Sequence, residues 1–389
     1  MRYNYLLVIF IFSIFCFYQC SSKSESVQNN AELNETSEDE SLNDLLKNIV
    51  LPDGFSINLY SDNVPNARSM TMSPSGILYV GTRQDDKVYA LEDTNSDHVA
   101  DKKYVIAQDM NTPNGVAFKD GDLYVAEINK IWKFVGIESN LNKVKKPVLI
   151  SDEFPSDKHH GWKYIAFGPD GKLYVPVGAP CNICESKKEV YASITRMNKD
   201  GSDFEIFAHG VRNTVGFTWH PETKEMWFTD NGRDMMGDNL PPCELNHAPK
   251  IGMHFGYPYC HGGDIADPTH GGEYSCTEFV APAQKLGPHV APLGLKFYRG
   301  NMFPAEYQND IFIAEHGSWN RSKKIGYRIM RVKIEDGRAV SYDPFVYGWL
   351  NEEEQEAFGR PVDVLIAPDG AMLVSDDKAG VIYRITYNQ

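Results

Sequence analysis

Residues 164–178 read YIAFGPDGKLYVPVG: a short apolar strand, a Pro-Asp-Gly turn and a second strand rich in aromatic and branched residues. Asp and Gly tolerate the positive φ that a tight hairpin turn requires, and the flanking residues suit a pleated, half-buried surface. Five further segments follow the same pattern: 69–82, 114–127, 214–230, 292–315 and 363–376. A hairpin of this kind cannot bury both faces alone, so a repeat every ~40–50 residues indicates stacked blades. The sequence therefore predicts an all-β protein, a six-bladed β-propeller.

The two ends of the repeat region predict how the ring closes. The strand-like segment 55–60 (FSINLY) has no hairpin partner of its own, and 381–387 (VIYRITY) is the last strand of the chain. We expect them to pair within one blade, because this shields both chain ends from edge-to-edge association. Helical patterns are rare, and only residues 42–48 and 352–358 are expected to be helical.

The N-terminus predicts export. Arg2 precedes an apolar run over residues 6–18, which has the length of a signal-peptide core and is short for a membrane span. The run ends at Cys20, and a polar stretch follows. This pattern resembles a bacterial lipoprotein, which implies a signal peptide over 1–20, a lipid anchor on Cys20, a flexible tether over 21–41 and a folded domain over 42–389. We therefore expect an exported, membrane-anchored lipoprotein facing the periplasm or cell surface; simple secretion is the alternative.

Export makes disulfides possible, and the folded region holds five cysteines. Cys181 and Cys184 could close a small ring, and Cys260 and Cys276 flank a loop rich in Gly and His, which would leave Cys243 free. The CxxC segment is not a haem attachment site, because the residue after it is Glu rather than His. A zinc site is a weaker alternative, since no second CxxC accompanies the first.

Four polar segments lie beside predicted strand ends, where propellers bind ligands at one mouth of the channel. They are 157–161 (DKHHG), 210–213 (GVRN), 229–246, and 315–321 together with 359–361. A loop His can act as a general base near neutral pH, Arg presents a fixed fork of donors to carboxylates, and acidic Gly-containing loops suit Ca²⁺. Taken singly, each segment also has a structural explanation: solvated histidines, a loop brace or surface charge.

The order of these segments resembles the glucose/sorbosone dehydrogenase family, the soluble quinoprotein sugar dehydrogenases. The matching motifs are Gly-Val-Arg-Asn at 210–213, Thr-Asp-Asn-Gly-Arg-Asp at 229–234 and Glu-Leu-Asn at 244–246. The likeness runs from about residue 51 to residue 387 and is closer to the sorbosone-type bacterial branch. It implies a propeller that holds pyrroloquinoline quinone (PQQ) and Ca²⁺ at the channel mouth.

The resemblance also implies roles for single residues. His160 falls where the family has its catalytic base, and Arg212 and Asn213 match the pair that contacts the quinone oxygens. Arg360 matches a cation that meets a PQQ carboxylate, and Arg321 is a further candidate for the same task.

The resemblance carries over four more residues. His289 is expected to line the cofactor site, where it replaces another residue type. Gly232 and Arg233 match the turn whose backbone carbonyls ligate calcium, and Glu244 is a candidate ligand of a second, structural calcium.

The implied activity is oxidation of an aldose or related sugar by hydride transfer to PQQ, with His160 as the base. A calcium-dependent lactonase is an alternative that would recruit Asn114, Asn213 and Asp230, and a non-catalytic carbohydrate-binding propeller is another. Expected partners are a small sugar and a diffusible quinone or separate electron-acceptor protein. The net charge of −15 argues against nucleic acid, and contact with a membrane is expected only through the N-terminal lipid.

Overall fold

The computed structural model describes residues 46–388. The predicted signal peptide, the tether and the lipid anchor at Cys20 lie outside the described residues. Within 46–388 no helix is long and apolar enough to cross a membrane.

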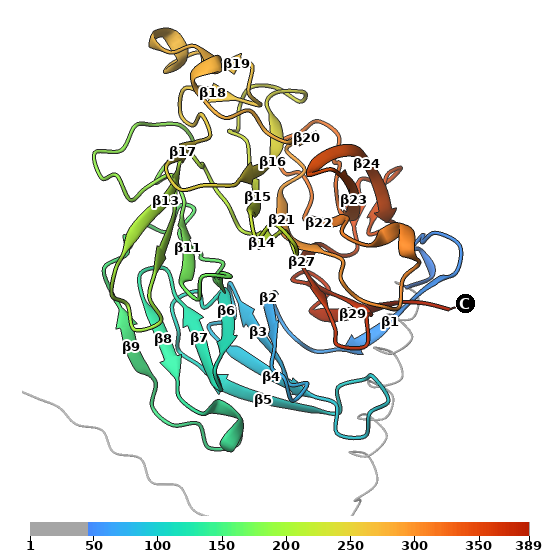
Figure 1. Ribbon diagram of the computed structural model, residues 1–389. Coiled ribbons are helices and arrows are strands. Elements are labelled where there is room, and N and C mark those ends of the chain that lie inside the picture. The colour runs from blue at the N-terminus through green and yellow to red at the C-terminus, as the bar shows by residue number, and fades with distance from the viewer. Residues whose placement is uncertain (1–45, 389) are drawn as a thin grey trace, which may run out of the picture. The chain divides into compact units, whose positions relative to one another are not determined.

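Six antiparallel sheets form the six blades of a β-propeller, as the repeats predict (Figure 1). The first blade contains β2 (Ala67–Met72), β3 (Leu78–Thr82), β4 (Val88–Glu92) and β5 (Lys102–Ala107). The second contains β6 (Gly115–Lys119), β7 (Asp122–Ala126), β8 (Ile131–Phe134) and β9 (Val148–Ser151). The third contains β10 (Ala166–Phe167), β11 (Leu173–Val177), β12 (Ser193–Met197) and β13 (Glu205–His209), with β17 (Met253–His254) added in parallel at its edge.

The remaining three blades follow the same plan. The fourth contains β14 (Phe217–Trp219), β15 (Met226–Asp230), β16 (Pro242–Ala248) and β20 (Gln284–Pro288). The fifth contains β21 (Pro292–Phe297), β22 (Ile311–Glu315), β23 (Arg328–Glu335) and β24 (Arg338–Val346). The sixth contains β27 (Pro361–Ile366), β28 (Met372–Asp376) and β29 (Val381–Tyr387), joined by β1 (Phe55–Ser61) from the start of the domain. Each predicted hairpin supplies the two inner strands of one blade.

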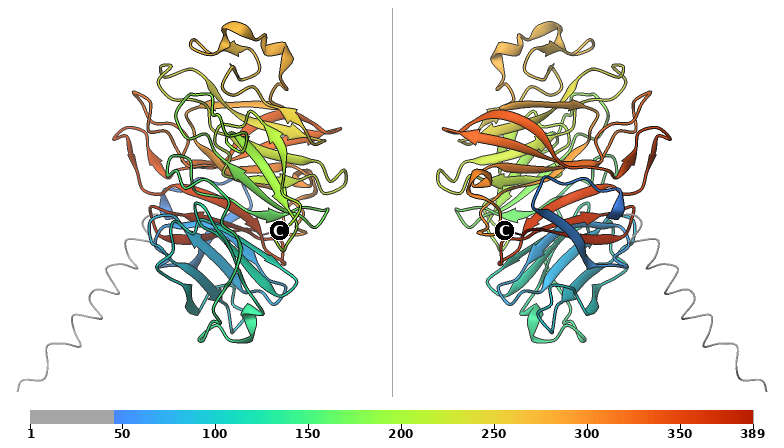
Figure 2. Two further views of the ribbon diagram at one scale, coloured as in Figure 1. Left: turned by 90° about the vertical axis from the view of Figure 1, so that its left-hand side faces the viewer. Right: turned by 90° about the vertical axis from the view of Figure 1, so that its right-hand side faces the viewer.

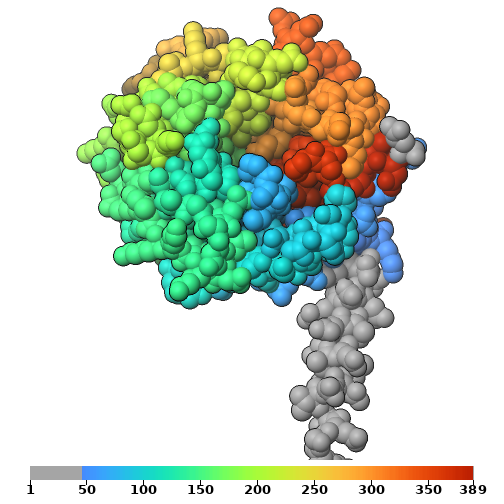
Figure 3. Space-filling model, turned by 60° about the horizontal axis from the view of Figure 1, so that its bottom comes forward, coloured from blue at the N-terminus to red at the C-terminus, as the bar shows by residue number. Residues whose placement is uncertain are grey.

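The ring closes as predicted. β1 pairs with β29 in antiparallel register, with Phe55 opposite Tyr387. The inner strand β2 of the first blade contacts β6 of the second blade and β27 of the sixth. In the space-filling view the colours run around the face in chain order until blue meets red (Figure 3).

The hydrophobic core lies between neighbouring blades. Tyr79 of β3 packs with Val116 and Leu123 of the second blade. The inner strands approach so closely that side chains are excluded at some positions: a Cβ on Gly115 would lie 2.7 Å from the Lys163 carbonyl oxygen. Burial of apolar side chains between blades at ~25 cal/mol per Å² stabilises the ring, and no blade could keep this surface dry by itself.

Two insertions interrupt the repeat. The first carries β17, the hairpin β18 (Cys260–His261) and β19 (Ile265–Ala266), and the 3₁₀ helices η2 (Gly271–Glu273) and η3 (Cys276–Glu278). The part that contains β18, β19, η2 and η3 projects away from the blades (Figures 1 and 2). The second forms the hairpin β25 (Leu350–Asn351) and β26 (Glu356–Ala357). Two more 3₁₀ helices, η1 (Ile137–Ser139) and η4 (Ala305–Tyr307), lie in blade loops.

The helix expected over 352–358 is therefore wrong. Leu350 pairs with Ala357 across a tight turn, and the Asn351 side chain accepts hydrogen bonds from the backbone N–H groups of Glu353 and Glu354. The chain then reverses direction, and the pairing of β25 with β26 takes the place of a helix. Of the other expected helix, the structure describes only the end, where Leu46 and Lys47 are helical.

Candidate functional site

A cavity of about 630 Å³ opens at one mouth of the ring. Its lining comes from the segments that precede the innermost strand of a blade or follow the second strand, because these ends meet at the same mouth. The lining is rich in cationic and aromatic side chains, and its volume is in the ordinary range for a small-molecule site. Of the predicted site residues, the cavity lining includes His160, Arg212, Asn213, Gly232, His289 and Arg360.

His160 is held in one orientation and one tautomer. Its Nδ1 lies 2.9 Å from the Ala179 carbonyl oxygen, which only accepts, so Nδ1 carries the proton and Nε2 is the ring's free acceptor. Its backbone has φ of 49°, a region that costs energy for a non-glycine residue. Gly178 makes room for it, since a Cβ there would lie 2.5 Å from the His160 Cβ.

The surroundings of His160 keep its ring neutral. Burial, and after it the positive charge of Arg212, lowers the pKa of His160 to about 2. The His159 ring packs at 4.0 Å, centroid to centroid, and the edge of Trp162 lies at 6.2 Å. A neutral imidazole with a free Nε2 can accept a proton from a hydroxyl group placed in the cavity.

Arg212 is more tightly engaged within the protein than the resemblance implies. Its Nε and Nη2 donate to the backbone carbonyl and side-chain oxygens of Asn182, and Nη2 also donates to Asp234 at 2.9 Å. Its Nη1 donates to the carbonyls of Asn231 and Gly232. These five bonds match the five N–H donors of a guanidinium, so the expected contact with a quinone oxygen stays a prediction.

Asp230 fixes the backbone of the Arg-Asn pair. Its carboxylate accepts from the backbone N–H groups of Arg212 at 2.8 Å and Asn213 at 2.6 Å. Burial, and after it the charge of Glu244, raises the pKa of Asp230 to about 7. The connection between β13 and β14 is thus tied to the end of β15 by hydrogen bonds.

A second cluster of basic side chains surrounds Asp377; of its members the sequence analysis singled out Arg360 but not Arg68 or Asp377. Arg68 Nη1 donates to Asp377 at 2.9 Å, His316 Nε2 lies at 3.0 Å and Arg360 Nε at 3.2 Å. Although burial opposes the shift, His316 and the arginines hold the pKa of Asp377 well below its usual range. Arg68 is only 1% exposed and also donates to Asn114. Three chain segments far apart in sequence thus place two arginines and a histidine beside one carboxylate.

Arg83 is a further cationic residue of the cavity that the sequence reasoning did not single out. It follows β3, and its guanidinium carbon lies 3.8 Å from the centroid of the Trp162 ring. No motif marks Arg68 or Arg83 as a site residue, because each is a lone basic residue at a strand end. Only the closed ring brings them to the cavity.

Three of the expected cofactor and metal contacts lie elsewhere or are occupied. Arg321 lies outside the cavity lining and donates to the Asp238 and Lys323 carbonyls. Arg233 also lies outside the lining, and its guanidinium pairs with Asp267; the role of its backbone carbonyl as a calcium ligand stays a prediction. Glu244 accepts from the Gly262 N–H at 2.7 Å and from Asn246 at 3.0 Å.

His289 lines the cavity with its ring turned toward the protein. Its Nε2 lies 2.9 Å from the Gly237 carbonyl oxygen and 3.1 Å from that of Leu240, so Nε2 carries a proton and donates to them. It thereby braces the loop between β15 and β16.

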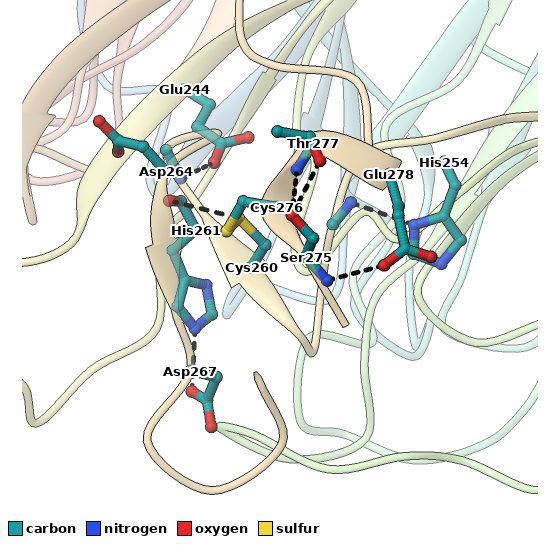
Figure 4. Close-up of a disulfide and its surroundings, with 12 residues drawn as sticks. Glu244, His254, Cys260, His261, Asp264, Asp267, Ser275, Cys276, Thr277 and Glu278 are labelled. Carbon is teal, nitrogen blue, oxygen red and sulfur yellow. Dashed lines mark hydrogen bonds and ion pairs between the residues drawn. A yellow bond between two sulfur atoms is a disulfide. The ribbon is translucent and has the colours of Figure 1, made fainter. Parts of the chain in front are cut away.

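The expected disulfide pairs are both present. Cys181 bonds to Cys184, and Cys260 bonds to Cys276 in the projecting insertion (Figure 4). Cys243 is free and buried at the cavity wall, and burial raises the pKa of its thiol to about 12. At neutral pH it is therefore an uncharged thiol that does not bind metal readily.

Comparison with known proteins agrees with this architecture. The chain belongs to the family described as "Domain of unknown function (DUF7133)", which matches residues 41–385. An uncharacterized protein of Borreliella burgdorferi is 35% identical over 364 residues, which cover 89% of this chain and 93% of that protein. A pyrroloquinoline quinone-dependent pyranose dehydrogenase of Coprinopsis cinerea is 23% identical over 400 residues; the match spans 85% of this chain and 54% of the fungal enzyme.

Solved structures share the fold at low sequence identity. A Trichoderma reesei carbohydrate-active enzyme of family AA12 superimposes with a TM-score of 0.76 at 20% identity, covering 87% of this chain and 98% of that one. The PQQ domain of the Coprinopsis pyranose dehydrogenase gives 0.73 at 18% identity, covering 87% and 97%. A PQQ-bound aldose sugar dehydrogenase of Streptomyces coelicolor gives 0.62 at 18% identity, covering 87% and 99%. The fold is thus that of PQQ sugar dehydrogenases, whereas the sorbosone-type branch stays a prediction.

Proposed function

We propose that this protein is a PQQ-dependent oxidoreductase that oxidises an aldose or related sugar. One observation carries the proposal: His160, with a neutral ring and a free Nε2, lines a cation-rich cavity at the mouth of this propeller. A base of this kind beside a cavity of small-molecule size suits removal of a hydroxyl proton.

The cavity fits a cofactor that carries several carboxylates. Arg68 and Arg360 line it from different segments, and although the Arg360 Nε lies 3.2 Å from Asp377, its Nη1 and Nη2 form no hydrogen bond or ion pair among residues 46–388. Charge-assisted hydrogen bonds to carboxylates are the strong ones, and a flat guanidinium can form them in pairs. With its two Nη groups unpaired, Arg360 would hold one carboxylate of PQQ.

When bound, PQQ would supply the acceptor for a hydride from the sugar carbon. His160 Nε2 accepts the proton of the hydroxyl on that carbon, while its Nδ1–H bond to Ala179 keeps the ring aimed at the cavity. Burial keeps the imidazole unprotonated before each turnover. Asp230 holds the backbone of Arg212 and Asn213 so that the wall of the cavity does not shift during the reaction.

The described residues do not by themselves form a calcium site. Within 46–388 no group of three acidic, His or Cys side chains converges on a point, and the Gly232 carbonyl accepts from Arg212 at 2.9 Å. A guanidinium on the same oxygen disfavours a divalent cation there. Calcium stays a prediction from the family resemblance, and no step above passes through it.

Two of the three side chains that the lactonase alternative needs as calcium ligands are engaged elsewhere in the protein. It would need Asn114, Asn213 and Asp230 to converge on an ion, yet Asn114 is fully buried and hydrogen-bonded to Arg68. The Asp230 carboxylate is bonded to two backbone N–H groups. A non-catalytic binding propeller would be favoured by scattered arginines, whereas four arginines line this cavity.

Three parts of the proposal rest on the sequence alone. We propose export with a lipid on Cys20, which places the enzyme at a membrane surface facing the periplasm or the cell exterior. Electrons then leave through a diffusible quinone or a separate acceptor protein.

The test is the variant His160→Ala with His98→Ala as its control, since His98 is an exposed histidine of the first blade. Removing His160 takes away the base, so sugar-driven dye reduction should fall by about 10²-fold or more while PQQ binding persists. His98→Ala should match the wild type. Full kcat in His160→Ala would show that this residue is not the base.

A further inference from the structure

Arg83 lacks the partners that the other cavity arginines have. Among residues 46–388 its guanidinium has no hydrogen bond or ion pair, and it lies over the face of the Trp162 ring. By contrast, Arg212 donates five hydrogen bonds within the protein, and Arg68 and Arg360 lie against Asp377. Arg83 is only partly exposed.

Leaving a partly buried guanidinium unpaired is costly, because its N–H donors lose water without gaining acceptors. Burial, and after it the charge of Arg68, lowers the pKa of Arg83 to about 10. The side chain therefore remains a cation at neutral pH; Arg68 and Arg360 repel it, and Asp377 attracts it. The cation–π contact with Trp162 offsets part of this cost and fixes the plane of the guanidinium.

The position of Arg83 relative to His160 indicates what it binds. Arg83 stacks on Trp162, and the Trp162 ring meets the His160 ring edge-on at a centroid distance of 6.2 Å. The two distances, 3.8 Å and 6.2 Å, place the Arg83 guanidinium carbon within about 10 Å of the His160 ring centroid, a span that one sugar ring with an anionic group can bridge. The Asp377 cluster is built instead from the first, fifth and sixth blades and supplies cations for the cofactor.

We propose that the substrate is an acidic sugar, whose anionic group is bound by Arg83 while a hydroxyl group of the same ring meets His160. This inference rests on the proposed function and names its substrate class. The oxidation is unchanged: the carbon's hydrogen leaves as hydride to PQQ, which is the oxidant, the hydroxyl proton passes to His160, and the hemiacetal becomes a lactone. Trp319, 70% exposed and at the cavity lining, offers an apolar face for the sugar ring.

The experiment compares D-glucuronate with D-glucose, and includes glucose 6-phosphate to separate a carboxylate from a phosphate. The variants are Arg83→Gln, Arg83→Lys and the control Arg338→Gln, which removes the same charge from the exposed outer strand β24. We measure kcat/KM by dye reduction, the Kd of PQQ, and binding of each sugar to the apoprotein by calorimetry.

The expected results follow from losing one charge-assisted contact. Arg83→Gln should lower kcat/KM for the preferred anionic sugar by about tenfold or more, leave glucose nearly unchanged and keep the Kd of PQQ. Arg83→Lys should recover part of the loss, and Arg338→Gln should match the wild type. A loss of PQQ affinity in Arg83→Gln, or equal use of glucose and both anionic sugars, would overturn the inference.

The experiment distinguishes a failure of this inference from a failure of the proposed function. If no sugar reduces the dye, the proposed function fails, but calorimetry still tests the anion site. Binding of glucuronate or glucose 6-phosphate that disappears in Arg83→Gln would support the site, and no binding of either anion to the wild-type apoprotein would overturn it.

Discussion

His160 shows how packing changes the chemistry of a single residue. An unperturbed histidine titrates near pH 6.5, but this ring is buried, donates from Nδ1 to Ala179 and lies near Arg212. Two neighbours, Gly178 and Ala179, are contributed by the end of β11, 18 or 19 residues along the chain. The sequence identifies the histidine, whereas its tautomer and neutrality depend on those neighbours.

The pH dependence of turnover should reflect this burial. In the folded protein the pKa of His160 is lowered to about 2, so the base stays neutral as the pH falls through 6.5. We therefore predict that protonation of His160 causes no loss of kcat/KM between pH 7 and pH 5. Over the same range the unfolded chain gains the proton and the folded chain does not, so the contribution of His160 to stability declines as the pH falls. A profile of kcat/KM against pH checks this prediction. A fall in kcat/KM near pH 6.5 that is present in the wild type and absent in His160→Ala would contradict it.

At the scale of elements, the Cys181–Cys184 loop supports Arg212. Asn182 lies inside this small disulfide ring and accepts from Arg212 through its backbone and side-chain oxygens at 2.9 and 2.8 Å. The pairing of these cysteines was predictable from spacing. Their connection to Arg212 was not, because it depends on how the loops after β11 and β13 meet at the cavity.

We predict that Cys181→Ser/Cys184→Ser lowers kcat/KM by about tenfold, since a displaced Arg212 shifts the cavity wall. The melting temperature should change little, because a ring this short restricts the unfolded chain only slightly. The double variant Cys260→Ser/Cys276→Ser, in the projecting insertion, is the control and should keep its activity. Unchanged kcat/KM in the first variant would show that the ring does not position Arg212.

Strand pairing also explains why the helix predicted over residues 352–358 is absent. A run of Glu and Gln favours a helix by propensity, yet Asn351 caps a turn and β25 pairs with β26. The Pro-Asp-Gly hairpins were predictable because turn chemistry and alternating apolar residues agree there. Arg68 and Asp377 could not be connected from the sequence, since 309 positions separate them.

For the whole molecule, closure of the ring is what brings distant segments together. β1 completes the sixth blade, and the Phe55 ring packs edge-on against Phe303, Tyr307, Phe345 and Tyr387. The first segment of the domain thus contacts both of the last two blades. The repeat pattern predicts this closure, because a ring of hairpins has an unpaired strand at each end.

We predict that deleting residues 46–61 destabilises the entire propeller. A chain that begins at residue 62 leaves the edge of β29 unpaired and the Phe55 pocket empty, so its melting temperature should fall by about 10 °C or more relative to 46–389. Calorimetry of the two chains provides the measurement. Equal melting temperatures would mean that β1 contributes little to closing the ring.

The most direct test of the account is a titration of purified residues 42–389 with PQQ in the presence of Ca²⁺, followed by addition of neutral and acidic aldoses. Cofactor absorbance reports binding, and dye reduction reports turnover. The account predicts saturable binding at micromolar PQQ or below, and bleaching of the cofactor when the preferred sugar is added. No binding at micromolar PQQ would contradict it, and lactone hydrolysis by the same protein would then be the next assay.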